Sequence, residues 1–171
     1  MANQTVQQTR SAQAMEQAGR RLAGTLPPGA IVALHGMYGA GKTTFARGLA
    51  RGLGVTSRWV QSPSFVLAHE FRAHRKGIQH FIHLDLWRLR AVHGEDRQTL
   101  THYFRLPNAI VAVEWAEHIP RSLRKYITHI VDIRMVKGKS RKIITKKLPY
   151  ANGEEQQQSI TKQRLLQEGN L

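Results

Sequence analysis

The residues best suited to chemistry lie in Gly36–Thr44, which reads Gly-Met-Tyr-Gly-Ala-Gly-Lys-Thr-Thr. This stretch fits the phosphate-binding pattern G-x-x-x-x-G-K-[ST]. Glycines let such a loop curl so that its backbone N–H groups point at one anion. The lysine then supplies a point charge for the outer phosphates, and the threonine hydroxyl can bind Mg²⁺. We therefore predict a nucleotide phosphate site formed by Gly36, Gly39, Ala40, Gly41, Lys42, Thr43 and Thr44.

The segments on either side of this loop have the patterns that a phosphate site needs. Residues 30–34 form a short apolar run, which is typical of a buried parallel strand. Phe45, Leu49 and Leu53 recur at i, i+4 and i+8, which predicts an amphipathic helix that Gly54 ends. Strand, glycine loop and helix in this order favour a phosphate site over the alternative, a glycine-rich turn without a ligand.

Two acidic residues follow apolar strands, where the acid that completes a Mg²⁺ site is usually found. Glu114 comes directly after the apolar run 109–113, and Asp85 follows the more polar run 81–84. We predict that Glu114 holds Mg²⁺ or its water and that Asp85 orients water or metal near the γ-phosphate. The alternative for Asp85 is a structural cap at the end of its strand.

Other polar residues give weaker signals. Ser62 and Ser64 flank Pro63 in the connection after the first site helix, where a hydroxyl can reach the metal and sense the γ-phosphate. His80 and His83 are three apart on a predicted strand and so point to opposite faces, which argues against a metal site between them. His35 is interpreted as a packed residue at a strand end.

The remaining patterns predict an α/β fold, a P-loop NTPase-like sheet flanked by helices with a C-terminal β-hairpin. We expect a frayed N-terminus over 1–10, one folded domain over 11–148 and a flexible polar tail over 149–171. Within that domain the expected elements are a helix over 11–26, strands over 66–71 and 79–87 around a turn at 74–77, a helix over 91–105, a strand over 109–113 and a hairpin over 127–136 and 141–148.

The composition excludes several classes of protein. The chain has 171 residues and no cysteine, which rules out disulfides, cysteine-ligated zinc and thiol catalysis. No stretch has the apolar length that spans a bilayer. The polar N-terminus lacks the layout of a signal peptide, so we expect a cytoplasmic protein without a membrane partner.

Positive charge is in large excess and unevenly spread. The formal net charge is +15, and residues 121–147 hold ten basic side chains against one acidic residue, Asp132. Such an excess attracts polyanions such as RNA, or an acidic protein partner. On a hairpin, Lys139, Arg141 and their cross-strand neighbours would form one basic stripe. The alternative is ordinary protection of an edge strand by lysine.

Four segments occur in an order that resembles one known family. They are the loop and helix start at 39–49, Gln-Ser-Pro-Ser-Phe at 61–65, His-Leu-Asp-Leu-Trp-Arg-Leu at 83–89 and Val-Glu-Trp-Ala-Glu at 113–117. Together they resemble the TsaE (YjeE) family of small bacterial ATPases, over roughly residues 10–147. The resemblance implies binding and hydrolysis of ATP with Mg²⁺. It also implies work with TsaB and TsaD in the threonylcarbamoylation of adenosine 37 of tRNA.

The resemblance also implies roles for individual residues. Lys42 and Thr43 match the phosphate and Mg²⁺ residues, Ser64 the loop hydroxyl that reaches the metal, and Asp85 the essential aspartate. Glu114 matches the strand-end acid and Trp115 the tryptophan near the nucleotide. The chain departs from the family at Met37-Tyr38, where Asp-Leu is common, at Ser64, where Thr is common, and at Trp87, where Tyr is common.

Two other functions remain as alternatives to this ATPase. One is a phosphate-loop kinase for a small molecule, although no acceptor pocket or arginine-bearing lid can be assigned from the sequence. The other is a non-enzymatic RNA-binding protein that contacts tRNA through the basic hairpin.

Overall fold

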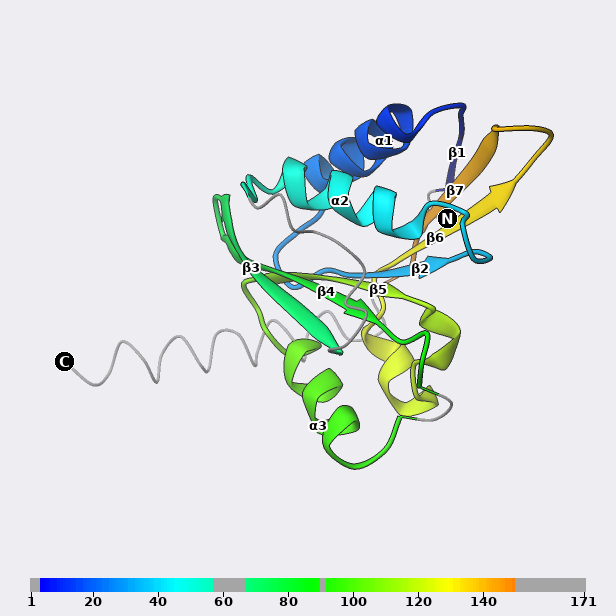
Figure 1. Ribbon diagram of the computed structural model, residues 1–171. Coiled ribbons are helices and arrows are strands. Elements are labelled where there is room, and N and C mark those ends of the chain that lie inside the picture. Colours follow the sequence, from blue (N-terminus) through cyan, green and yellow to red (C-terminus); the bar gives the residue numbers. More distant parts are fainter. Residues whose placement is uncertain (1–3, 57–66, 90–91, 150–171) are drawn as a thin grey trace.

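One mixed sheet organises the fold. The structure is a computed structural model that describes residues 4–56, 67–89 and 92–149. Its seven strands lie in the spatial order β1 (Gln4–Thr9), β7 (Arg141–Lys147), β6 (His129–Met135), β2 (Ile31–His35), β5 (Ala109–Glu114), β4 (Ile78–Asp85) and β3 (Ala68–Arg75) (Figure 1). The four strands β6, β2, β5 and β4 are parallel. Strands β7 and β3 pair antiparallel with β6 and β4, and β1 pairs antiparallel with β7.

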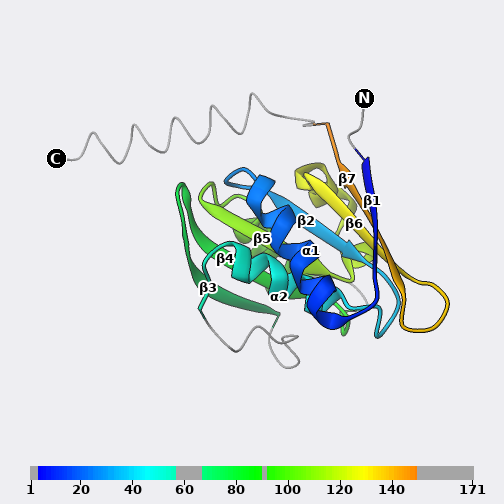
Figure 2. The same cartoon turned by 90° about the horizontal axis from the view of Figure 1, so that it is seen from above.

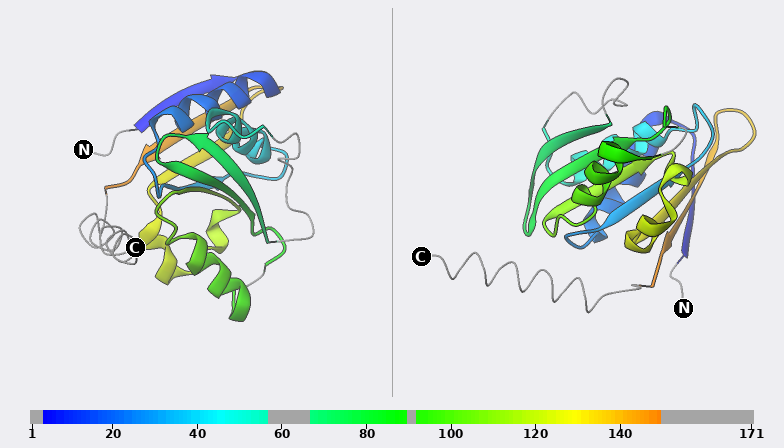
Figure 3. Two further views of the ribbon diagram at one scale, coloured as in Figure 1. Left: turned by 90° about the vertical axis from the view of Figure 1, so that its left-hand side faces the viewer. Right: turned by 90° about the horizontal axis from the view of Figure 1, so that it is seen from below.

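Helices cover both faces of this sheet. Helices α1 (Ala12–Thr25) and α2 (Lys42–Gly52) lie side by side on one face, as Figure 2 shows. Helix α3 (Gly94–Tyr103) and two short 3₁₀ helices, η1 (Ala116–His118) and η2 (Arg121–Tyr126), lie on the other face (Figure 3). Within the described ranges, no helix has the length and apolar character to cross a membrane.

The alternation of side chains along the strands explains these layers. In β2, Val32 and Leu34 pack into the core under α1 and α2, whereas Ile31 and Ala33 pack into the core under α3 and the 3₁₀ helices. Both sets are buried, and residues 31–34 of β2 are therefore apolar at every position, which is typical of parallel strands covered on both faces. The predicted α/β class, a helix-flanked sheet with a C-terminal hairpin, is confirmed.

The elements around the phosphate loop agree with the sequence pattern. Strand β2 ends at His35, the loop follows, and α2 begins at Lys42. The helix has its C-cap at Leu53, and Gly54 follows in the left-handed conformation with φ +76°. Gly54 is therefore the C′ residue that the sequence predicted.

The N-terminal prediction was wrong in part. Residues 1–10 were expected to be frayed, but Gln4–Thr9 form β1 and pair antiparallel with β7. The sequence signal is weak because β1 is an edge strand whose side chains are mostly exposed and polar. Pairing with β7 supplies hydrogen-bond partners for the backbone of β1, and the pattern of residues within 1–10 does not reveal such pairing. The predicted tail over 149–171 lies, beyond residue 149, outside the described residues.

Other predicted elements are present with different boundaries: the strand expected over 79–87 is Ile78–Asp85, and the helix expected over 91–105 is Gly94–Tyr103. Strand β3 continues to Arg75, so the turn before β4 contains only Lys76 and Gly77 rather than all of 74–77. The basic stripe predicted through Lys139 and Arg141 is not formed, because Lys139 lies in the turn and Arg141 lies opposite Met135; Arg134 and Lys142 are the basic residues that lie opposite each other. A one-residue change in register moves a side chain to the other face of a strand.

Candidate nucleotide site

Three glycines shape the loop between β2 and α2. Gly36, Gly39 and Gly41 have φ of +146°, +73° and +107°, a region that side chains other than glycine rarely adopt. A Cβ on Gly36 would lie 2.6 Å from the backbone oxygen of Ile133 in the neighbouring strand. The loop therefore needs glycine at Gly36 for both conformation and space.

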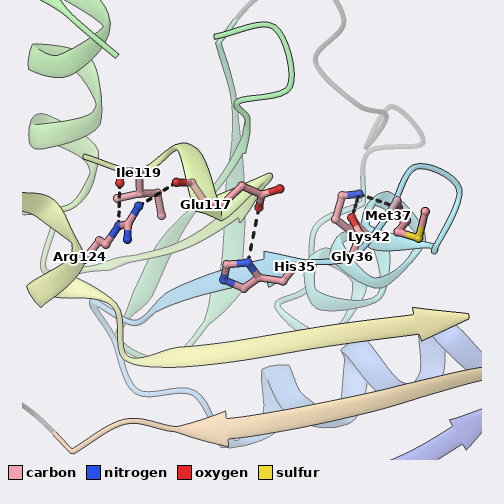
Figure 4. A network of polar contacts seen from close by, with 7 residues as sticks. All are labelled: His35, Gly36, Met37, Lys42, Glu117, Ile119 and Arg124. Atoms are coloured by element: carbon pink, nitrogen blue, oxygen red, sulfur yellow. Dashed lines mark hydrogen bonds and ion pairs between the residues drawn. The ribbon is translucent and has the colours of Figure 1, made fainter. Parts of the chain in front are cut away.

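Lys42 is a buried cation at the start of α2. Its side chain is almost wholly buried, and Nζ donates to the backbone oxygens of Gly36 at 2.7 Å and Met37 at 3.0 Å (Figure 4). The ammonium group also lies over the ring of Trp115, 3.7 Å from its centroid. Burial lowers the pKa of Lys42 below its ordinary value, and the nearby carboxylates Glu114, Glu117 and Asp85 oppose that shift.

Thr43 and Glu114 meet although they are far apart in the sequence. Glu114 ends β5 beside β2, where it pairs with Leu34, and is buried. The Thr43 hydroxyl Oγ1 lies 3.1 Å from Glu114 Oε2 and donates to it. The structure thus brings the predicted Mg²⁺ hydroxyl and the predicted strand-end acid into direct contact.

Asp85 lies beside Glu114 at the same edge of the sheet. The two residues are cross-strand partners in the parallel pair β4 and β5. Asp85 Oδ1 also accepts a hydrogen bond of 3.0 Å from the backbone N–H of Trp87, so the capping contact considered as its alternative role exists. The capping contact uses only the oxygen Oδ1 of the carboxylate. The position of Asp85 beside Glu114 also agrees with the second acid that the sequence predicted.

Trp115 begins an aromatic row that runs from Lys42 to the surface. It is the one described residue other than glycine with positive φ, at φ 56° and ψ 47°, a conformation that costs on the order of 1 kcal/mol. Its ring lies 4.2 Å from that of Trp87, which in turn lies 6.1 Å from Tyr38. Two positions where the sequence departs from the TsaE pattern, Tyr38 and Trp87, are therefore neighbours.

A second contact network positions the segment that follows Glu114. His35 Nδ1 lies 3.5 Å from Glu117 Oε2, and Arg124 donates to the backbone oxygens of Ile119 at 2.9 Å and Glu117 at 2.8 Å (Figure 4). These contacts tie η1 to the end of β2. His35 thus lies at a strand end, as predicted, and contacts a carboxylate there.

The remaining predicted residues have separate outcomes. Gly39 is exposed, Ala40 is buried, and Thr44 lies in the first turn of α2. Ser64 and its neighbour Ser62 lie outside the described residues, so their predicted role stays a prediction. His80 does not join His83; it pairs with Glu70 at 2.7 Å.

Sequence reasoning missed one member of the site. His83 Nε2 lies 2.8 Å from Glu114 Oε1, and its side chain is fully buried. The available signal was spacing, because His83 and Asp85 are two residues apart on one strand and share a face. Nothing in the local pattern indicated that β5, which carries Glu114, would pair with the strand of His83.

The fold and the loop geometry define an α/β protein of the P-loop NTPase-like class. The family model described as "Threonylcarbamoyl adenosine biosynthesis protein TsaE" matches residues 9–144. The chain therefore belongs to the TsaE family.

Individual relatives agree with this assignment. The chain is 41% identical over 110 residues to a Synechocystis protein named tRNA threonylcarbamoyladenosine biosynthesis protein TsaE. The matched segment covers 63% of this chain and 68% of that relative. A Bacillus subtilis protein of the same name is 38% identical over 104 residues, 61% of each chain. The crystal structure of Bacillus subtilis YdiB superposes with a TM-score of 0.67 at 24% identity, covering 96% of this chain and 98% of that one, and supports the fold.

Proposed function

We propose that this protein is a Mg²⁺-dependent ATPase that supports the threonylcarbamoylation of adenosine 37 in tRNA. The observation that carries the proposal is the contact between Thr43 and Glu114 beside the buried ammonium of Lys42. This combination supplies a hydroxyl for Mg²⁺, an acid beside it and a cation for phosphate, the parts that phosphate-loop ATPases use.

The residues present fit ATP and Mg²⁺. A Cβ at Gly36 would clash with the backbone oxygen of Ile133, so the loop can follow this path only with glycine there, and a glycine-bearing loop at a helix N-terminus is the kind of backbone cradle that binds phosphate. Mg²⁺ is usually bound by one or two protein groups together with waters and substrate phosphates. Thr43 and Glu114 are a sufficient protein contribution of that kind.

Each residue then has a defined task. Lys42 leaves the carbonyl oxygens of Gly36 and Met37 and binds the outer phosphates. Thr43, which donates to Glu114, would supply a hydroxyl ligand to the metal, and Asp85, beside Glu114, would orient the attacking water. When bound, Mg²⁺ neutralises charge on the β- and γ-phosphates.

Membership of the TsaE family supports the pathway and the partners that we propose. The family and the named relatives are described by threonylcarbamoyladenosine biosynthesis. We therefore propose that the chain works with TsaB-like and TsaD-like proteins, of which the TsaD-like protein carries the transferase site. Contact with tRNA is then indirect or made through the basic hairpin.

The test is turnover of Mg-ATP by the purified protein, alone and with TsaB and TsaD from the same organism. The wild type should hydrolyse ATP, and the complete set should form threonylcarbamoyladenosine in tRNA. Lys42→Ala and Glu114→Ala should each lower ATPase activity at least about 100-fold. Lys76→Ala, in the exposed turn after β3, is the matched control and should be unchanged.

Three results would overturn this proposal. A folded wild type that neither binds ATP nor supports the modification would contradict it outright. Transfer of the γ-phosphate to a small acceptor would favour a kinase. Salt-sensitive tRNA binding by a protein that neither binds nor hydrolyses ATP would favour a non-enzymatic RNA-binding protein.

A further inference from the structure

His83 is a buried polar side chain that the proposed ATPase chemistry does not use. It lies in β4, with zero side-chain exposure, on the face of the sheet that α2 covers. Its ring stacks near that of Phe81, at 6.3 Å between centroids, and its strand pairs with β5, which carries Glu114. A polar ring is rarely placed in such a core without a partner.

The partner of this ring is the acid of the candidate site. Both carboxylate oxygens of Glu114 accept a hydrogen bond: Oε1 lies 2.8 Å from His83 Nε2, and Oε2 lies 3.1 Å from Thr43 Oγ1. An ionised carboxylate only accepts hydrogen bonds, so Nε2 carries the ring proton. Among the described residues, Nδ1 of this buried ring has no partner, so the bond to Glu114 is the one polar contact that orients it there.

A second group competes for the same carboxylate. Lys42 is close enough for Glu114 to raise its pKa, and a buried ammonium and carboxylate attract strongly. Nevertheless Lys42 Nζ donates to the backbone oxygens of Gly36 and Met37. A carboxylate bonded at one oxygen could rotate about its side-chain torsions toward the cation, whereas one bonded at both oxygens is fixed.

We propose that His83 is a positioning residue that holds Glu114 against Thr43 and away from Lys42. The bond from Nε2 fixes the carboxylate plane, so that Thr43 is oriented for the metal and Lys42 stays available for phosphate. This inference rests on the proposed function for its consequence, since it predicts how Mg²⁺ strengthens nucleotide binding. The contact between His83 and Glu114 itself does not depend on that function.

The sharpest test compares two side chains of nearly equal length and shape at this position. His83→Gln keeps an N–H donor at a reach similar to that of Nε2, whereas His83→Met removes it. The probe is ADP, and its affinity is measured by calorimetry with Mg²⁺ and with EDTA, so the readout does not depend on turnover. His80→Gln is the matched control, because His80 also pairs with a glutamate on the same sheet.

The expected result is a loss of the Mg²⁺ effect on ADP binding that is larger than the loss of metal-free affinity. Removing a residue that orients a metal-binding group typically lowers metal affinity by about 10- to 100-fold, so His83→Met should lose that factor in the Mg²⁺-dependent part of ADP binding. Its affinity in EDTA should fall by a smaller factor, because a Glu114 carboxylate released from His83 can turn toward Lys42 and compete with phosphate for its ammonium group. His83→Gln should recover most of the loss, and His80→Gln should match the wild type.

Equal Mg²⁺ dependence in His83→Met and the wild type would overturn the inference, as would a His83→Gln protein as impaired as His83→Met. Histidine ¹⁵N NMR of the wild type adds a measurement that needs no variant: a proton on Nδ1 rather than Nε2 would contradict the proposed contact. If the wild type binds no Mg-ADP, the proposed function fails, while the NMR result still decides the contact of His83 with Glu114.

Discussion

Histidines in this fold have different roles because their surroundings differ. His83 is fully buried against Glu114, and His80 on the same strand is only half-buried and pairs with Glu70. His129, at the start of β6, is also buried; its Nδ1 lies 2.9 Å from the hydroxyl of Thr128. Burial, helped by the charge of Lys147, lowers the pKa of His129 to about 4.

The pKa of His129 predicts a loss of stability in acid. Because the folded pKa of about 4 lies below the ordinary histidine value of 6.5, the unfolded chain binds more protons between these values. The contribution of neutral His129 to the free energy of unfolding, roughly 3 kcal/mol, is therefore complete above pH 6.5 and is lost as the pH falls toward 4. His129→Asn, which can keep a hydrogen bond to Thr128, should flatten this part of the pH dependence in urea unfolding.

The control for this prediction is His102→Asn, which changes an exposed histidine of α3. Its unfolding free energy should follow the wild-type curve at every pH. Curves for His129→Asn that run parallel to the wild type between pH 6.5 and about 4 would show that His129 titrates alike in both states.

At the scale of elements, the close contact of α1 and α2 sets the position of the phosphate loop. A Cβ on Gly19 would lie 2.2 Å from the backbone oxygen of Phe45, and one on Gly48 would lie 2.1 Å from that of Glu16. The two helices therefore touch backbone to backbone at these glycines. Since α2 begins at Lys42, moving it would also move Lys42 and Thr43.

Gly48→Ala should separate the two helices. We expect it to lower the free energy of unfolding by roughly 2 kcal/mol or more, because backbone atoms cannot yield as side chains do. Nucleotide binding should weaken as well, since α2 carries two residues of the site. Thermal unfolding and ADP titration measure the two effects.

Gly24→Ala is the matched control in α1. A Cβ at Gly24 meets nothing within 4 Å, and alanine in a helix loses less conformational entropy on folding than glycine. This variant should be more stable than the wild type by about 0.5 kcal/mol or more. A Gly48→Ala protein as stable as Gly24→Ala would refute the packing argument.

For the molecule as a whole, charge is the dominant property. The net charge is +15, and Asp132, the one acid within 121–147, is already bonded to Arg134 at 2.7 Å. Arg134 and Lys142 lie opposite each other on β6 and β7, with Lys137 and Lys139 in the turn between these strands. This end of the molecule therefore has basic side chains in excess of acidic ones.

We expect this excess to give salt-dependent attraction to tRNA. Affinity should fall at least about tenfold between about 50 and about 200 mM salt. Replacing Lys137, Lys139 and Lys142 with glutamine should reduce the slope of log affinity against log salt, while Lys76→Gln in the other hairpin should change it less. Fluorescence titration at several salt concentrations measures the slopes, and equal slopes for both variants would show that the hairpin is not the contact.

Much of the fold was predictable because its signals are local. Apolar runs specified β2 and β5, the i, i+4 pattern specified α2, and positive φ at Gly54 followed from its place after the helix. Strand β1 was missed because an exposed polar edge strand has no alternating pattern. The stripe through Lys139 and Arg141 was wrong because the partner of each strand residue depends on where the turn ends and on the register of the partner strand.

The sequence by itself determined the residue types of the loop: glycines where the backbone turns left-handed, and the lysine and threonine that we propose for phosphate and metal. Only the tertiary structure decided which distant residues meet them. Parallel pairing of β2, β5 and β4 brings Glu114 to Thr43 and places Asp85 beside it. His83 reaches Glu114 across the same pairing. These contacts depend on the order of strands in the sheet, which long-range packing fixes and local spacing along the chain does not encode.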